Sequence, residues 1–153
     1  MAILNVFEPS TTANSLERLN KLSAGMTPKW GKMNAPQMLA HLNVAYDIAY
    51  GKTEVKKMGG FGKLMMKLFV KKIVVGEAPY KKNSRTAPYF LIADEREFNA
   101  EKEKLAAYIQ QVEKDGASFF EGKESAAFGP LSAKEWSNQF QKHLDHHFQQ
   151  FGI

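Results

Sequence analysis

The chain has 153 residues and a mass of 17.2 kDa, which fits a single domain over residues 1–153. Hydrophobic residues make up 44% and charged residues 24%, so the chain can bury a sizeable core and does not have the composition of a disordered protein. It contains no cysteine, which excludes disulfides, thiolate metal ligands, iron–sulfur clusters and a cysteine nucleophile and fits a reducing compartment.

The hydropathy pattern of the chain predicts neither export nor membrane insertion. Residues 1–9 have no basic region and no long apolar region, so they do not resemble a signal peptide. The most apolar stretch, residues 61–75, is interrupted by four lysines, whereas a membrane span needs about 20 mainly apolar residues. We therefore predict a cytoplasmic protein with no transmembrane segment.

The net charge of +5 is unevenly distributed. Residues 52–85 contain ten basic and two acidic residues and carry +8, so the rest of the chain carries −3. A basic segment can attract nucleic acid, acidic lipid or an anionic substrate, but it can equally be a solvated face. No nucleic-acid-binding motif accompanies the charge, so nucleic acid is not an expected partner and the role of this segment stays open.

The first two helices are predicted from their ends and their apolar faces. The first covers residues 10–22, before Gly25 and Pro28, and its expected inward face consists of Ala13, Leu16, Leu19 and Leu22. The second follows Asn34, whose side chain can cap free backbone N–H groups, and ends near Tyr50. Its expected inward face consists of Met38, Leu39, Leu42, Ala45, Tyr46 and Ala49.

A short basic helix, a long loop and two further helices complete the chain. The basic helix is predicted over residues 61–73, and we expect burial of its apolar face, which consists of Leu64, Met65, Leu68 and Phe69. Residues 79–88 form a loop, and residues 89–92 could be extended. A helix from Asp94 or Asn99 ends at Gly116, and residues 119–130 are loop-like. The last helix begins with a Ser132/Glu135 capping box and runs to residue 151. An all-α four-helix bundle follows, with the basic helix and the long loop between its second and third main helices.

The placement of histidine is the most informative feature of the sequence. His41 lies on the second predicted helix, and His143, His146 and His147 lie near the end of the last one. Because His143 and His147 are four apart, both imidazoles project from one helical face and can bind one metal ion. If the two helices pack together, His41 supplies a third nitrogen and leaves one position open for water or substrate. His146 lies about 100° around the helix from His147 and is expected at the rim of the site, and Asp145 is expected to be solvated.

Each candidate also has a purely structural interpretation. Histidines four apart arise by chance, and His41 could be an ordinary hydrogen-bonded histidine. Gln37 and Gln139 each precede a histidine by one turn and could line the site as helpers, although solvated or helix-capping roles are commoner for glutamine. We expect Trp30 and Trp136 to fill the core, and the seven methionines to fill gaps in it.

Two extended motifs flank the predicted bundle. The first is Trp30-Gly-Lys-Met-Asn-Ala-Pro-Gln-Met-Leu-Ala-His41. The second combines Phe128-Gly-Pro-Leu-Ser-Ala-Lys-Glu-Trp136 with His143-Leu-Asp-His-His147-Phe-Gln-Gln-Phe-Gly152. In sequence and separation they resemble the DinB-like (YfiT-type) family of bacterial metal-binding four-helix bundles. That family often continues the last histidine with Arg-Gly-Gln, and here only Gln150 matches.

The resemblance implies a site and a range of activities. By this resemblance, His41, His143 and His147 would hold zinc or nickel, and the protein would form a homodimer. Family members with known activities include thiol-dependent transferases, isomerases and hydrolases. Because the residues after His147 depart from the family pattern, a preference for a thiol cofactor stays open.

Three functions are therefore weighed. The favoured one is a metal-dependent hydrolase or thiol S-transferase acting on a small molecule, with a low-molecular-weight thiol as a candidate partner. The alternative is a non-catalytic bundle that binds a ligand or a metal. The third is a surface-binding protein that uses the basic helix on an anionic surface, and it ranks lowest because burial of the apolar face would explain the same pattern.

Overall fold

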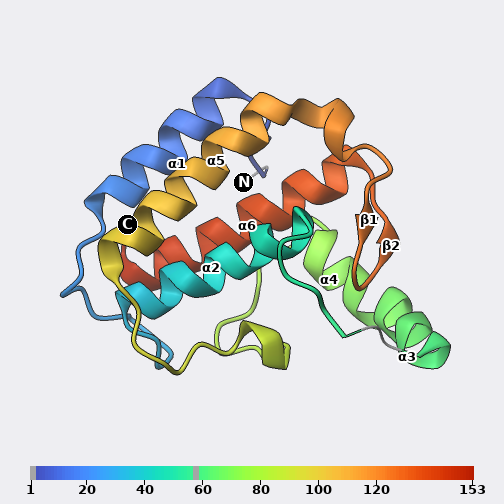
Figure 1. The fold of residues 1–153 in the computed structure, drawn as a ribbon, viewed down its shortest axis with the longest axis horizontal. Helices are drawn as coiled ribbons and strands as arrows, with labels where there is room; N and C mark the ends of the chain where they lie inside the picture. Colours follow the sequence, from blue (N-terminus) through green and yellow to red (C-terminus); the bar gives the residue numbers. More distant parts are fainter. Residues whose placement is uncertain (1–2, 57–58) are drawn as a thin grey trace.

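The computed structural model describes residues 3–56 and 59–153 (Figure 1). In it, four helices form the bundle that the sequence predicts. They are α1 (Pro9–Lys21), α2 (Ala35–Ala49), α5 (Phe98–Phe120) and α6 (Ala133–Phe151). Helices α1 and α5 lie side by side, and α2 packs against both α5 and α6 (Figure 1). The predicted all-α fold is confirmed.

Both helices that carry histidine begin with a capping box, and these helix starts match the prediction. In α2 the Asn34 side chain accepts the backbone N–H of Gln37, and the Gln37 side chain accepts that of Asn34. Ser132 and Glu135 make the same reciprocal bonds at the start of α6. These bonds satisfy backbone donors that the helix itself leaves free, so both helix starts are fixed.

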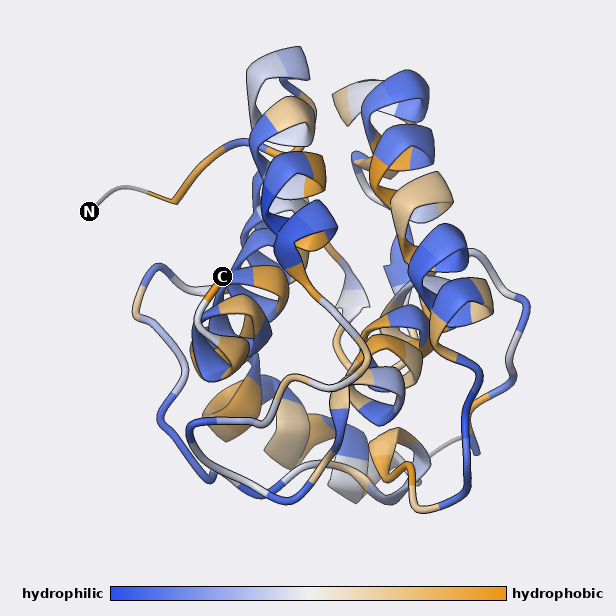
Figure 2. Ribbon diagram, turned by 90° about the vertical axis from the view of Figure 1, so that its left-hand side faces the viewer, coloured by the Kyte–Doolittle hydropathy of each residue, from blue (hydrophilic) through white to orange (hydrophobic). Residues whose placement is uncertain are grey.

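The inward faces match the prediction for α2 and differ for α1. All six residues of the predicted α2 face are buried, and Trp136 is buried in the core as expected. Of the predicted first-helix face, Leu19 and Leu22 are buried and Leu16 packs on the core, but Ala13 is exposed, and the buried side chains of α1 also include Thr11, Thr12 and Ser15. A strict spacing of three residues drifts about 60° per step around a helix, so it cannot stay on one face over four positions. Figure 2 shows hydrophobic and hydrophilic residues alternating along the bundle helices.

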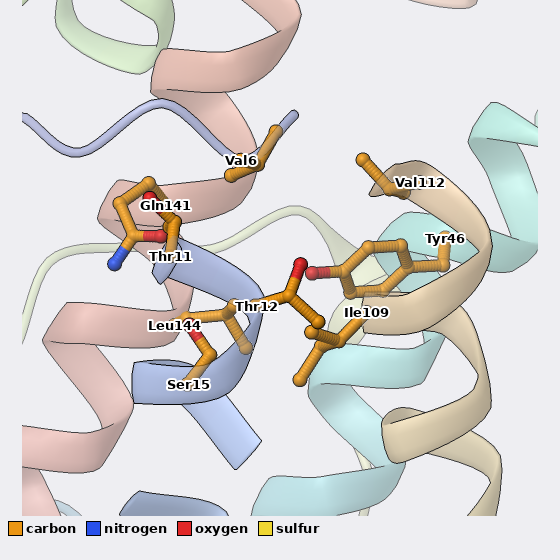
Figure 3. A pocket seen from close by; sticks show the side chains of 9 residues that line it. All are labelled: Val6, Thr11, Thr12, Ser15, Tyr46, Ile109, Val112, Gln141 and Leu144. Carbon is orange, nitrogen blue, oxygen red and sulfur yellow. The ribbon is translucent and has the colours of Figure 1, made fainter. Parts of the chain in front are cut away.

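Polar residues of α1 line a small cavity of about 10 Å³ (Figure 3). It lies between α1, α2, α5 and α6, and its lining includes Thr12, Ser15, Tyr46 and Gln141. The Gln141 amide is fully buried, yet neither its nitrogen nor its oxygen has a hydrogen-bond partner among the described residues. None of the histidines lines this cavity, so it is separate from the candidate metal site.

The segment between α2 and α5 contains the basic helix and the long loop. The helix consists of α3 (Gly60–Met65), a π-helical turn η1 (Met66–Val70) and α4 (Lys71–Val75). The loop over residues 76–97 contains a 3-10 turn, η2 (Pro88–Phe90), so the run 89–92 is not a strand.

The end of α5 is more structured than predicted. Gly116 interrupts the helix with a positive φ of 73°, as expected of a helix stop, but helical structure resumes as far as Phe120. The predicted loop after it contains a two-residue hairpin, in which β1 (Glu124–Ser125) pairs antiparallel with β2 (Gly129–Pro130).

The predicted burial of the basic helix is wrong. Leu64, Met65, Leu68 and Phe69 are all exposed, and the residues that pack on the core are Met66, Val70 and Val74. The physical reason is the position of α3 at the edge of the molecule, beyond the end of the bundle, where only one side of the helix meets other elements (Figure 1). In the described parts of the chain, no helix is long and apolar enough to cross a membrane.

Candidate metal centre

The bundle brings together the three histidines that the sequence singles out. His41 lies in the middle of α2, and His143 and His147 lie one turn apart on α6. One ring nitrogen from each lies within 4.8 Å of those of the other two, and the ring centroids of the three pairs are 4.6–5.0 Å apart. His41 and His147 are buried, and His143 is partly exposed. Such a convergent group could hold one metal ion.

The protonation pattern of His41 follows from its neighbour. Its Nδ1 lies 2.8 Å from the backbone carbonyl oxygen of Phe90, which can only accept a hydrogen bond. Nδ1 therefore carries the proton, and Nε2 keeps its lone pair. Nε2 lies 2.9 Å from Nε2 of His143, so His143 donates to it in this arrangement. The geometry thus directs the Nε2 lone pair of His41 at the ring of His143, toward the other histidines.

His147 is held in the same way through Gln150. The Gln150 amide nitrogen donates to the Trp30 carbonyl oxygen at 2.6 Å, which leaves its Oε1 to face His147 Nδ1 at 2.7 Å. Since an amide oxygen can only accept, Nδ1 of His147 carries the proton and Nε2 is free. A hydrogen-bonded second ring nitrogen is the usual arrangement of metal-binding histidines, because it fixes the ring and its tautomer.

The Trp30-Gly31 pair makes this arrangement possible. Gly31 has a positive φ of 81°, a conformation that residues with a side chain rarely adopt. A Cβ at this position would lie 2.6 Å from the Gln150 amide nitrogen. The glycine therefore lets the Gln150 side chain reach the Trp30 carbonyl, and a backbone hydrogen bond from Lys29 to the Gln150 carbonyl, 2.7 Å long, ties the same loop to α6.

Burial keeps the three imidazoles neutral. Loss of hydration lowers the pKa of His41 below its ordinary value, that of His143 well below it, and that of His147 to about 3. Repulsion between neighbouring rings lowers the pKa values further, because two adjacent imidazolium ions would repel each other. Neutral imidazoles are the form that binds metal ions, so the site is in its metal-binding protonation state at pH 7.

Aromatic rings surround the three histidines. The Phe90 ring contacts His41 and His143, at centroid distances of 5.3 and 5.9 Å, and Tyr80 lies 6.4 Å from His143. Both come from the loop over residues 76–97, which covers this part of the bundle. His146 does not belong to the group of three and packs edge-on against Trp30, with 5.8 Å between the ring centroids. It therefore lies beside the group of three and does not belong to it.

The two glutamines differ in their surroundings. The Gln37 side chain is used in the α2 capping box and also donates to the Asp94 carbonyl oxygen at 3.2 Å. Gln139, one turn before His143 on α6, has a buried side-chain oxygen with no hydrogen-bond partner among the described residues.

Asp145, which was expected to be solvated, instead forms an ion pair with Arg18 of α1.

Sequence reasoning missed the groups that orient the histidines. Phe90 acts through a backbone carbonyl and Gly31 through the absence of a side chain, so neither leaves a chemical signature at its own position. Gln150 is noticed only as the single residue that matches the family pattern after His147. The one available signal was the Trp30-Gly31 dipeptide, and its connection to Gln150 appears only in three dimensions.

Fold and site together define an all-α protein with a buried three-histidine cluster that could bind a metal. Comparison with protein families matches residues 7–152 to a family described as "Protein of unknown function (DUF1569)". This match covers nearly the whole chain, so the protein belongs to that family. No curated protein and no solved structure matches the chain significantly.

Proposed function

We propose that this protein is a metal-dependent DinB-like protein in which His41, His143 and His147 hold one zinc or nickel ion. The observation that carries the proposal is the orientation of the rings. His41 and His147 each place Nδ1–H on an acceptor, so on both rings Nε2 carries the lone pair that a metal ion would bind, in place of the hydrogen bond that His41 makes with His143. Imidazole suits zinc and nickel, and the chain has no cysteine to supply a different donor set.

A purely structural cluster explains this arrangement less well. Without an ion, the Nε2–H of His143 occupies the lone pair of His41, but among the described residues no hydrogen bond engages Nε2 of His147. A bound cation would satisfy all three lone pairs at once. The single N–H proton of neutral His143 would then sit on Nδ1 in place of Nε2, so metal binding at this site is coupled to a change of tautomer at one residue.

The proposed reaction class is hydrolysis or thiol S-transfer on a small molecule. A divalent ion with three imidazole ligands supplies a Lewis acid with an exchangeable fourth position, which acidifies water or a thiol. The partial exposure of His143 places the accessible side of the site at that residue. Phe90 and Tyr80 would exclude bulk water there, and the unpartnered oxygen of Gln139 would be available to accept a hydrogen bond from a bound substrate.

The experiment is elemental analysis of protein purified without a histidine tag or chelator. We expect about one zinc or nickel ion per chain, and none in a His41→Ala/His147→Ala variant. His146→Gln is the matched control, because it removes a neighbouring imidazole that lies outside the group of three, and it should retain the metal. Metal-free wild-type protein whose Tm does not rise when Zn²⁺ or Ni²⁺ is added would overturn the proposal.

Activity and assembly need separate tests. Hydrolysis of ester and amide substrates and S-transfer from small thiols should be compared between metal-loaded wild type and His143→Ala. Turnover that is lost in the variant supports an enzyme, whereas stoichiometric metal with no turnover favours a non-catalytic metal- or ligand-binding bundle. The homodimer implied by the family resemblance is tested by light scattering in solution.

A further inference from the structure

The basic helix presents a continuous apolar face to solvent. Six large hydrophobic side chains, 40–77% exposed, make up what we call the exposed face: Phe61, Leu64, Met65, Leu68, Phe69 and Ile73. Single exposed hydrophobic residues are common on protein surfaces, but a contiguous set on one short element marks an interaction site.

The π-helical turn keeps this face continuous. In a regular α-helix, Ile73 would lie about 120° around the axis from Phe61. The turn η1 (Met66–Val70) has more residues per turn, so it rotates the residues after it back toward the same side. Met66, Val70 and Val74 remain on the opposite side, packed against the core. The π-helical turn therefore keeps the exposed residues on one side of the helix and the core-packing residues on the other.

The helix is firmly attached at its C-terminal end. Lys142 of α6 donates to the carbonyl oxygens of Ile73, Val74 and Gly76 at 2.7–3.2 Å, and Asn138 donates to that of Val75 at 2.9 Å. Lys71 forms an ion pair with Glu135 at 2.8 Å. These contacts hold the helix against the bundle at this end, whereas α3 lies beyond the end of the bundle (Figure 1).

The charged residues of the basic helix itself are all lysines, and one of them, Lys71, is paired with Glu135 of α6. Lys63, Lys67 and Lys72 lie among the apolar residues of the exposed face and are exposed, and no acidic residue occurs between positions 60 and 76. The wider segment of residues 52–85 carries a net +8. A second copy of the chain docked through the same face in a symmetric dimer would bring these lysines against their own copies. Charge therefore argues against self-association here and for an anionic partner.

We propose that the exposed face docks the protein onto the surface of an anionic lipid bilayer. An exposed row of aromatic and aliphatic side chains flanked by lysines is the pattern of a helix that lies in the membrane interface, with apolar groups among the acyl chains and lysines near the headgroups. This binding is independent of the metal site and requires no change in the bundle.

The test is flotation of the full chain with vesicles of phosphatidylcholine alone or mixed with phosphatidylglycerol. We expect binding to the mixed vesicles, little binding to phosphatidylcholine alone, and release as salt is raised. Leu68→Ser/Phe69→Ser should weaken the partition at least ten-fold, and Lys63→Glu/Lys72→Glu should do the same.

Matched variants separate this effect from general changes. Leu91→Ser removes an equally exposed hydrophobic residue elsewhere, and Lys21→Glu/Lys114→Glu makes the same change in net charge on α1 and α5, so both should still bind. Failure of the wild type to bind mixed vesicles would overturn the proposal. So would dimerisation that depends on Leu68 and Phe69, or salt-sensitive binding to duplex DNA in place of vesicles.

Discussion

Gly31 is the residue on which the orientation of His147 depends, although it touches neither the ring nor the candidate ion. A side chain at this position is strained by the positive φ and collides with the Gln150 amide. Gly31→Ala is therefore expected to displace Gln150 and deprive His147 of its acceptor, which lowers zinc affinity about 10- to 100-fold. Competition with a chromophoric chelator measures this.

Gly25→Ala is the control for that substitution, because nothing lies within 4 Å of its added methyl group and its φ is not positive. It should keep the affinity of the wild type. Equal zinc affinity in Gly31→Ala and the wild type would show that Gln150 does not orient the ligand.

The lowered pKa values of the histidines predict how the metal-free protein responds to acid. Below a pH of about 6.5 the unfolded chain binds protons at these histidines while the folded chain does not, so the unfolded state binds more protons and the free energy of unfolding falls as pH falls. The expected slope is about 1.4 kcal/mol per pH unit for each histidine that stays neutral, down to its folded pKa. For His147 this range extends to about pH 3.

Urea unfolding of chelator-treated protein at a series of pH values between neutral and acidic checks this slope. His147→Gln should reduce it by about one histidine's share. A free energy of unfolding that does not change between pH 7 and pH 5 would contradict the neutral, buried state assigned to the three rings.

Gln141 is expected to limit the stability of the bundle. Its amide is fully buried beside the small cavity in Figure 3 and has no hydrogen-bond partner among the described residues. Gln141→Met keeps the size of the side chain and removes both polar atoms, so it should raise the free energy of unfolding by about 1 kcal/mol. Loss of stability in this variant would instead indicate a water molecule bound in the cavity to the Gln141 amide.

At the scale of elements, one lysine fastens α4 to the bundle. Lys142 joins three carbonyl groups at the end of α4, and Lys142→Met would leave all three without this donor. We expect a loss of about 2 kcal/mol in the free energy of unfolding, and faster amide hydrogen exchange in residues 66–75 than elsewhere. Lys134→Met removes an exposed ion pair with Glu77 and should change neither quantity. Uniform exchange across the chain in Lys142→Met would contradict this role.

The elements also show how far sequence reasoning extends. The starts of α2 and α6 could be predicted, because they are encoded locally by the capping boxes Asn34/Gln37 and Ser132/Glu135. The burial of the basic helix could not, because an apolar face indicates that something covers it but does not say whether that is the bundle or another surface. The leucines on the inward face of α1 were predicted, but its buried threonines and serine were not, since polar residues do not register in an apolar pattern.

At the scale of the whole molecule, the candidate site could be predicted only in part. The spacing of His143 and His147 predicts that they share a face, but their encounter with His41 depends on how α2 packs against α6. Spacing alone does not determine that packing, and the expectation that the two helices meet came from the resemblance of their motifs to the DinB-like family. Phe90 and Gly31, which orient the rings through the backbone, could be recognised only in the folded chain.

X-ray absorption at the zinc edge of the zinc-loaded protein tests the central claim most directly, because it reports the ligands themselves. The account predicts three imidazole nitrogens at about 2.0–2.1 Å and one further light ligand in a tetrahedral site, with the imidazole signal lost in His41→Ala/His147→Ala. A spectrum dominated by oxygen ligands, or one that this double variant leaves unchanged, would show that the ion binds elsewhere and that the three histidines are only part of the core.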